Sequence, residues 1–363
     1  MSIDIIPPRL AALGWTASRA RDSVALLAEG LRPARILAQH RDRYIVGTAD
    51  ADSTAVPLGR SRLHAPASLE IPAVGDWVGV RQRDGGLAVI VLVLRRDSAF
   101  VRQSAGEASA AQVVAANIDL ALIATAVAGD LNPRRLERYV TLAWESGATP
   151  AVLLTKADLA RAEDLAAARV AASRAAPGVR IVTVSTLAGD GMEELSQLLA
   201  PGLTAVIVGS SGVGKSTLVN HLLGETHLQT QDVRHDGKGR HTTTHRELVR
   251  LASGALLIDT PGMRELQLWS DGTGVTAAFT DVEMLAEDCR FRDCAHEVEP
   301  GCAVRRAVAS GALQPERLAS YHKLRREVAW LAQRTDVLAS AEAKQRMKML
   351  HRAQYGFLQT RKR

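Results

Sequence analysis

Cysteine is scarce in this chain, with three occurrences in 363 residues. So few thiols, and an odd number of them, exclude a scaffold held together by disulfides and are typical of a reducing compartment, so we expect a cytoplasmic protein. Apolar runs of the roughly 20 residues that a membrane span needs are absent as well, and the first residues do not form a secretion signal. We therefore expect no membrane partner.

Aromatic residues are also rare, at 4% of the chain, so the hydrophobic cores must be built mainly from aliphatic side chains. The apolar fraction of 47% and the charged fraction of 23% are typical of globular proteins and exclude a wholly disordered chain. The length predicts two or three domains.

Lysine is missing from residues 31–105, where 11 Arg stand against 7 Asp and Glu. Residues 321–363 hold 11 Lys and Arg against 3 Asp and Glu, while the whole chain carries a net charge of +6. Two basic ends thus flank an acidic middle. This pattern favours an anionic partner such as nucleic acid, although solvated helix faces would produce it too.

The character of the sequence changes along the chain and divides it into four parts. Residues 1–30 form a short helical lead. Residues 31–105 contain the strand-like runs RYIVGTAD, DWVGVRQRDGG and LAVIVLVLRR, which predict a small barrel or sandwich; an OB-type barrel, able to bind RNA, fits the length and the basic character. In residues 106–274, apolar runs alternate with amphipathic segments, which predicts a parallel sheet covered by helices on both faces. Residues 275–363 are expected to be helical, with a basic tail.

The most specific motif is a phosphate-binding loop. The segment Gly209-Ser210-Ser211-Gly212-Val213-Gly214-Lys215-Ser216 matches G-x-x-x-x-G-K-[ST] without a mismatch, after the apolar run TAVIV and before a helical segment. The backbone N–H groups of such a loop surround phosphates at the positive end of a helix. Lys215 is expected to reach the β- and γ-phosphates, and the Ser216 hydroxyl to bind Mg²⁺. The next residue, Thr217, is included in the predicted nucleotide site.

A second phosphate element, Asp259-Thr260-Pro261-Gly262, ends the apolar run LLID. An Asp at the tip of a buried strand can hold the water shell of Mg²⁺, and the Gly262 N–H can face the γ-phosphate.

Between these two motifs lies the polar loop GRHTTT, residues 239–244. We predict that Thr243, with Thr242 as the alternative, binds Mg²⁺ and responds to the γ-phosphate. We further predict that His241 orients the attacking water; the alternative is an ordinary surface histidine. Together with Lys215, these are the predicted catalytic residues.

Two further elements resemble the guanine-binding motifs of GTPases, usually written NKxD and SA. Thr155-Lys156-Ala157-Asp158 follows the run AVLL, and Ser185-Thr186 follows RIVTV. The Asp158 carboxylate can accept from two guanine donors that adenine lacks, which would select GTP over ATP, and the Lys156 stem would lie along the base. Thr155 stands where Asn is usual and Thr186 where Ala is usual, which leaves an ATP-using enzyme as an alternative.

The order of these motifs is unusual. In ordinary GTPases the phosphate loop comes first, whereas here both base-binding elements precede it. The same sheet can form if the chain is circularly permuted. The segment after Asp259 then ends the nucleotide domain and leads directly into the C-terminal region.

All three cysteines lie within 14 residues, in the pattern C-x4-C-x-H-x5-C. The residues are Cys289, Cys294, His296 and Cys302. Three thiolates and one imidazole form a closed tetrahedral set for one structural Zn²⁺. The alternative is a group of buried free thiols beside an unrelated histidine.

Taken together, these features resemble one family, the circularly permuted bacterial GTPases called ribosome small-subunit-dependent GTPase A. The likeness rests on the order TKAD, VST, GSSGVGKS, GRHTTTHREL and DTPG before the Cys/His pattern, and it covers residues 31–310. It implies an N-terminal OB-fold, a permuted GTPase domain and a C-terminal zinc-binding domain. It also implies a switch role for Thr243, a Mg²⁺-linked role for Asp259, and a role in hydrolysis for His241, since Met263 stands where many GTPases keep a glutamine.

The resemblance further implies a function. Members of the family bind the 30S subunit late in its assembly and hydrolyse GTP there under stimulation by the ribosome. We therefore expect a GTPase that uses GTP, Mg²⁺ and one Zn²⁺, contacts 16S rRNA, and leaves the subunit after hydrolysis. We expect a monomer, because this function needs no second copy. The alternative is a nucleotide-gated rRNA-binding scaffold whose hydrolysis is incidental, which the apolar Met263 favours modestly.

Overall fold

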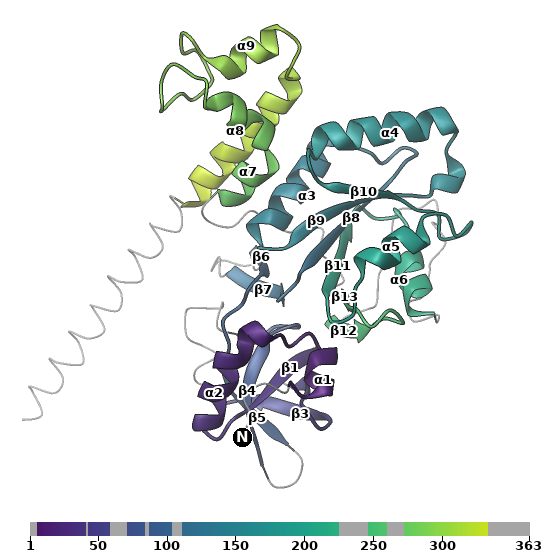
Figure 1. The fold of residues 1–363 in the computed structure, drawn as a ribbon, viewed down its shortest axis with the longest axis vertical. Coiled ribbons are helices and arrows are strands. Elements are labelled where there is room, and N and C mark those ends of the chain that lie inside the picture. The colour runs from purple at the N-terminus through teal and green to yellow at the C-terminus, as the bar shows by residue number, and fades with distance from the viewer. Residues whose placement is uncertain are drawn as a thin grey trace, which may run out of the picture.

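The computed structural model describes residues 6–40, 43–58, 71–83, 87–103, 111–224, 246–259 and 272–332. A barrel near the N-terminus, a central sheet with helices on both faces, and a helical C-terminal region follow one another in space as they do in the chain (Figure 1).

The N-terminal strands form a closed barrel. They are β1 (Arg32–Gln39), β2 (Tyr44–Gly47), β3 (Asp52–Pro57), β4 (Trp77–Gln82) and β5 (Ala88–Val93). Strand β1 pairs with both β2 and β4, and β3 pairs in parallel with β5, which closes the ring in the order β1-β2-β3-β5-β4. The OB-type barrel is therefore confirmed, and the sandwich alternative is excluded because a sandwich would leave β1 open on one side.

The N-terminal lead covers one side of this barrel. It contains α1 (Pro8–Ala12), the 3-10 turn η1 (Ala17–Arg19) and α2 (Ala20–Ala28). Trp15 meets Trp77 of β4 edge to face, with ring centroids 4.7 Å apart, and Leu10 and Leu26 are buried in the same cluster. Helix α2 ends before Gly30, whose φ of +67° lies in the left-handed region that favours glycine.

The central sheet is parallel except at the edge beside the barrel. Its strands are β8 (Leu120–Ala126), β9 (Thr149–Thr155), β10 (Arg180–Thr183), β11 (Thr204–Gly209), β12 (Arg246–Arg250) and β13 (Leu256–Asp259). The order is β10-β9-β8-β11-β13-β12, and β12 and β13 form an antiparallel hairpin. Strands β9 and β10 thus precede β11 in the chain but share its sheet and direction, as the permuted order of motifs predicts.

Helices bury both faces of this sheet. Helices α3 (Pro133–Glu145) and α4 (Ala162–Ala175) cover one face, and α5 (Met192–Leu198) and α6 (Lys215–Leu223) cover the other (Figure 1). Side chains alternate between the faces: Ile123 and Val152 belong to the core under α3 and α4, whereas Leu122 and Leu153 belong to the core under α5 and α6. Continuous apolar strands are therefore explained by burial on both sides.

The barrel and the central sheet share one hydrogen-bonded ladder. Strand β1 pairs with β12, with Ala38 opposite Glu247. Beside this junction Arg35 is buried, donates to the carbonyls of Gly75 and Asn117, and lies over the Trp77 ring. Burial lowers the pKa of Arg35 to about 10. The predicted boundary at residue 105 falls between β6 (Ala99–Gln103) and β7 (Ala111–Ala116), two strands that pair with each other.

The C-terminal region is helical, with α7 (Thr273–Ala278), α8 (Thr280–Ala286), α9 (Ala303–Ala309) and a helix described over residues 315–332. It is joined to the nucleotide domain mainly through α3. The Arg317 side chain, 5% exposed, donates to Glu137 of α3 and to Asp281 of α8 and stacks on Phe279 at 3.9 Å. This buried cluster connects three helices.

Candidate nucleotide site and metal cluster

The phosphate loop lies between the end of β11 and the start of α6. A Cβ atom on Gly209 would stand 2.2 Å from the Ala124 carbonyl oxygen of β8, so no larger residue fits there. Gly212 and Gly214 have φ angles of +80° and +92°. These glycines let the chain turn tightly into the first turn of α6, which carries Ser216 and Thr217, while Ser210, Ser211 and Val213 form the body of the loop.

Lys215 is the first residue of α6. Its Nζ donates to the carbonyl of Gly209 at 2.9 Å and to that of Ser210. The loop thus holds its own ammonium group beside the helix N-terminus, where the positive ends of the backbone dipoles gather. This arrangement concentrates positive charge where a phosphate chain needs it.

The ends of β9 and β10 bring the base-binding elements together. Ser185, which is buried, donates its hydroxyl proton to the exposed Asp158 carboxylate at 2.6 Å. The N–H of Ala188 donates to the same Ser185 oxygen at 3.1 Å, which holds the turn that contains Thr186. The Asp158 carboxylate is therefore oriented, with its outer oxygen left to face a base.

Thr155 links this base-binding turn to the phosphate loop. Its buried hydroxyl lies 2.7 Å from the Val213 carbonyl oxygen and 3.3 Å from that of Thr125 on β8. A hydroxyl has one proton to donate, and the shorter distance assigns it to Val213. Lys156, the next residue, adopts the left-handed conformation with φ of 56°, and its stem passes the Gly214 backbone. The structure therefore brings both sets of predicted residues to one site.

The hydrogen bond between Thr155 and Val213 could not be predicted from the sequence. The two residues are separated by 58 positions, and no local pattern predicts a bond between them. One feature of the sequence points to a polar contact here: Thr155 ends a strand at the position where GTPases usually carry Asn, which also forms hydrogen bonds.

Other predicted residues lie outside the described part of the chain. They are His241, Thr242, Thr243, Gly262 and Met263. Asp259 ends β13, which pairs with β11, so its backbone lies one strand from the phosphate loop.

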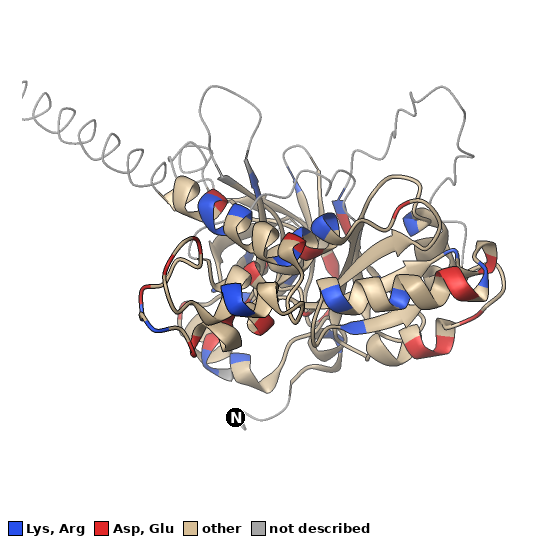
Figure 2. Ribbon diagram, turned by 90° about the horizontal axis from the view of Figure 1, so that it is seen from above, with Lys and Arg blue, Asp and Glu red and all other residues tan. Residues whose placement is uncertain are grey.

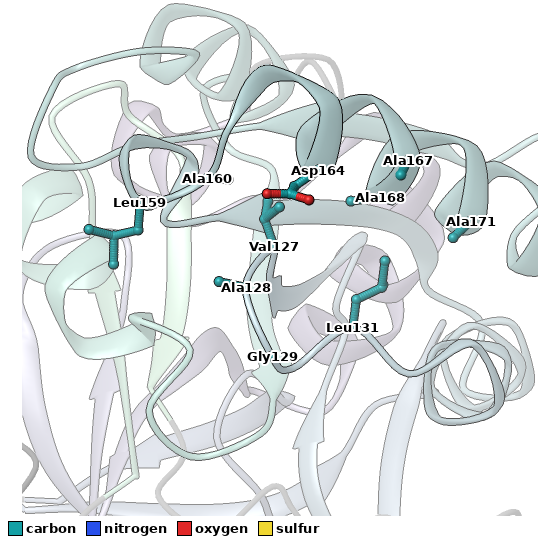
Figure 3. A pocket seen from close by; sticks show the side chains of 10 residues that line it. All are labelled: Val127, Ala128, Gly129, Leu131, Leu159, Ala160, Asp164, Ala167, Ala168 and Ala171. Atoms are coloured by element: carbon teal, nitrogen blue, oxygen red, sulfur yellow. The ribbon is translucent and has the colours of Figure 1, made fainter.

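A hollow of about 390 Å³ lies beside the base-binding turn (Figure 3). Val127 and Leu131, from the loop after β8, face Leu159 and the start of α4 across it, and Asp164 points into it. Its lining contains none of the residues predicted to bind nucleotide. The hollow is therefore separate from the nucleotide site.

The Cys/His cluster has the geometry of a metal site. The four ligand atoms lie within 4.8 Å of one another; the Cys289 and Cys302 sulfurs are 3.9 Å apart, and His296 Nδ1 lies 3.6 and 3.5 Å from them. A tetrahedral zinc with bonds of about 2.3 Å to sulfur and about 2.0 Å to nitrogen requires separations of about 3.8 Å and about 3.5 Å. The residues present therefore fit this ion.

Close packing in the cluster shifts the pKa values of several of its groups. Burial raises the pKa of Cys289, but the N–H groups of Val304 and Ala303 at the start of α9 and the neighbouring thiols bring it below its ordinary value. Burial, followed by hydrogen bonds with the other two thiols, raises the pKa of Cys294 to about 11. Burial lowers the pKa of His296, which favours the neutral imidazole that binds metal ions. A bound cation would offset the repulsion between the thiolates.

Comparison with known proteins decides the family. The family model described as RsgA GTPase matches residues 93–269. A small ribosomal subunit biogenesis GTPase RsgA from Opitutus terrae is 44% identical over 95% of this chain and 96% of its own length. The chain belongs to the RsgA GTPase family. A second relative of that name, from Streptomyces coelicolor, is 45% identical over 93% of this chain and 92% of its own length.

Solved structures agree with this family. YjeQ from Thermotoga maritima aligns with a TM-score of 0.62 and 25% identity, over 82% of this chain and 99% of its own. YloQ, described as a circularly permuted GTPase, has the same fold with a TM-score of 0.59 and 22% identity, over 82% of this chain and 95% of its own. A family model described as ABC transporter also matches residues 192–359, a span that contains the phosphate loop common to many nucleotide-binding proteins.

Membership of the RsgA family confirms the predicted resemblance, the permuted fold and the GTPase activity. A GTPase of this family uses GTP and Mg²⁺. No described helix is both long enough and apolar enough to cross a membrane.

Proposed function

We propose that this chain is a GTPase of small ribosomal subunit biogenesis, as the names of its relatives say of those proteins. The observation that carries the proposal is the contact between Thr155 and Val213. It joins base-binding and phosphate-binding elements into one site, in a chain that matches its relatives over nearly their whole length.

The described residues of the site divide the binding of GTP between them. The loop of residues 209–216 surrounds the phosphates with backbone N–H groups, and Lys215 moves from the loop carbonyls to the β- and γ-phosphates. Asp158 accepts from the guanine edge in the orientation that Ser185 gives it. The Lys156 stem lies along the base, and the backbone of Thr186 closes its edge. Ser216 and Thr217 face the phosphates from the start of α6, with Ser216 as a ligand of Mg²⁺.

Hydrolysis depends on the segments that flank β12 and β13. In the proposed site, Thr243 binds Mg²⁺ and contacts the γ-phosphate, Asp259 holds the metal's water shell, and the Gly262 N–H faces the γ-phosphate. His241 orients the attacking water. Loss of the γ-phosphate releases these contacts, which weakens binding to the subunit. Rate enhancement comes from the position of the water and from the charge around the phosphates.

The Cys/His cluster holds one structural zinc ion. Cys289, Cys294, His296 and Cys302 fill all four positions of a tetrahedron, which leaves none for a reacting water. The ion would stabilise the loop between α8 and α9, where few hydrophobic residues are buried.

We propose four units: a lead over residues 1–30, an RNA-binding barrel over 31–105, a permuted GTPase domain over 106–274 and a zinc-binding domain over 275–363. The Arg-rich barrel and the basic C-terminal region bind 16S rRNA of the 30S subunit. The protein acts as a monomer in the cytoplasm.

Nucleotide-dependent co-sedimentation with purified small subunits tests this function. We expect more protein in the subunit pellet with a non-hydrolysable GTP analogue than with GDP, and GTP turnover that rises when subunits are added. A Lys215→Ala variant, which loses the phosphate contact, is expected to show neither effect. Equal GTP turnover with and without subunits would contradict the proposal and favour the rRNA-binding scaffold with incidental hydrolysis. Release of a His241→Ala variant from the subunits at the wild-type rate would do the same, because the proposal expects this variant to stay bound.

A further inference from the structure

The helix of residues 315–332 has two chemically different sides. Tyr321, Leu324 and Leu331 are buried against the C-terminal region. The opposite side carries His322, Lys323, Arg326 and Trp330, which we call the C-terminal stripe. Their spacings of one, three and four residues place them within an arc of about 100° on a helix. Figure 2 shows blue positions along this helix, close to where it meets the grey trace.

Apart from the half-buried His322, the stripe is exposed, and it carries positive charge. Lys323 and Arg326 are both exposed, and the Arg326 Nε donates to the His322 carbonyl one turn earlier at 3.3 Å, which orients the guanidinium along the helix. The helix has two acidic residues within 315–332. Glu327 makes a two-bond ion pair with Arg138 of α3, at 2.6 and 2.8 Å, and Glu316 lies in the first turn, away from Trp330.

Trp330 is 52% exposed at the end of this stripe. An indole with half of its surface in water offers a flat apolar face on which a planar group can stack. Along the helix axis, Trp330 lies about 12 Å from His322, at about 1.5 Å per residue. Two cations thus stand within one or two turns of an aromatic platform.

A groove of about 560 Å³ extends the stripe toward the metal cluster. The groove is lined by His322, by Arg305 of α9 and Glu297, and by apolar residues that include Val308 and Leu318. His322 therefore belongs to both the groove and the stripe, and the two features form one continuous surface.

We propose that the C-terminal stripe binds an unpaired RNA segment, with a base stacked on Trp330 and phosphates on Lys323 and Arg326. Every base has a face that can stack on an indole, and cations beside an aromatic ring are the pattern of single-strand binding surfaces. A membrane surface is disfavoured because the stripe has no second large apolar side chain beside Trp330. An acidic protein segment would pair with the two cations but would not by itself stack on the indole.

This inference rests on the proposed function, since the small subunit supplies the RNA. It is tested with a fluorescently labelled single-stranded RNA of ten nucleotides and the full-length protein, by anisotropy between 50 and 200 mM KCl. We expect Trp330→Ala to raise the Kd by about 5- to 150-fold with the salt dependence unchanged, and Trp330→Phe to bind within a few-fold of the wild type. The double variant Lys323→Ala/Arg326→Ala should lower the slope of log K against log salt by about 1.4.

Matched changes on α4 serve as controls, because Val170 is 51% exposed and Arg174 is exposed there. Val170→Ala and Arg174→Ala should leave both the Kd and the salt slope unchanged. Circular dichroism and zinc content establish that each variant is folded.

The inference would be overturned if the wild type did not bind the RNA, or if Trp330→Ala bound it like the wild type. It would also be overturned if Trp330→Ala lost the small subunit but kept the oligonucleotide, because the partner would then be a protein. Failure of the wild type to co-sediment with subunits while the oligonucleotide results hold would contradict the proposed function and leave RNA binding by the stripe intact.

Discussion

Replacing Thr155 with valine tests how the two halves of the nucleotide site are connected. Valine keeps the shape of the side chain but removes the hydroxyl that donates to the Val213 carbonyl at 2.7 Å. Because Thr155 is 5% exposed, water cannot readily replace the lost donor. An unsatisfied buried carbonyl costs about 1–3 kcal/mol.

We expect this cost to appear mainly in nucleotide affinity. Without the bond, the loop around Val213 can move its carbonyl toward water, and it must return to its bound shape before the phosphates fit. A cost of about 1–3 kcal/mol corresponds to a rise of about 5- to 150-fold in the Kd for GDP, since about 1.4 kcal/mol is a factor of ten. Thr155→Asn keeps a donor and should bind GDP within a few-fold of the wild type.

The measurement is equilibrium binding of fluorescent GDP, together with chemical denaturation of the same variants. Thr141→Val is the matched control, because Thr141 is also buried and its hydroxyl donates to the Glu137 carbonyl within α3. It should alter the free energy of unfolding without altering the Kd. Wild-type affinity in Thr155→Val, or an equal loss of affinity in Thr141→Val, would refute this reasoning.

Two further changes test the C-terminal region. Arg317→Met should lower the free energy of unfolding by about 3–5 kcal/mol, because it removes the ion-pair partner of the buried Glu137 carboxylate. The GDP affinity should stay within a few-fold of the wild type. An unchanged denaturation curve would contradict the stabilising role of the Arg317 cluster. Cys294→Ser should reduce the zinc content measured by atomic absorption from about one ion per chain to well below one, with loss of helical signal that added zinc does not restore. A wild-type protein that is folded and free of metal would contradict the zinc assignment.

Local chemistry explains which parts of the site could be predicted from the sequence. The phosphate loop needs glycines at positions where the backbone has a positive φ or approaches another strand, as at Gly209 beside the Ala124 carbonyl. These demands fall on Gly209, Gly212 and Gly214, within six residues, so a short motif contains them. The order of the motifs then implies a permuted sheet, and the strand order confirms it.

Long-range packing explains what could not be predicted. The sequence of β1 does not alternate between apolar and polar residues, because the charged Arg35 occupies a buried position. Burial of this guanidinium is tolerated because it donates hydrogen bonds to the carbonyls of Gly75 and Asn117. The pairing of β1 with β12 joins residues about 200 positions apart. In the sequence, Arg317 cannot be told apart from the other basic residues of the C-terminal region. Only the structure shows that it is buried and pairs with Glu137 and Asp281.

The central claim is that Asp158 and the phosphate loop bind one guanine nucleotide. The most direct measurement is calorimetric titration of GTP, ATP and XTP into the wild type and into Asp158→Asn. The wild type should bind GTP far more tightly than the other two, because the carboxylate accepts from the guanine N–H and exocyclic amine. Asp158→Asn should lose GTP affinity and gain XTP affinity, since xanthine offers a carbonyl to the new amide donor. Equal affinity for GTP and ATP in the wild type, or an unchanged preference in Asp158→Asn, would contradict the account.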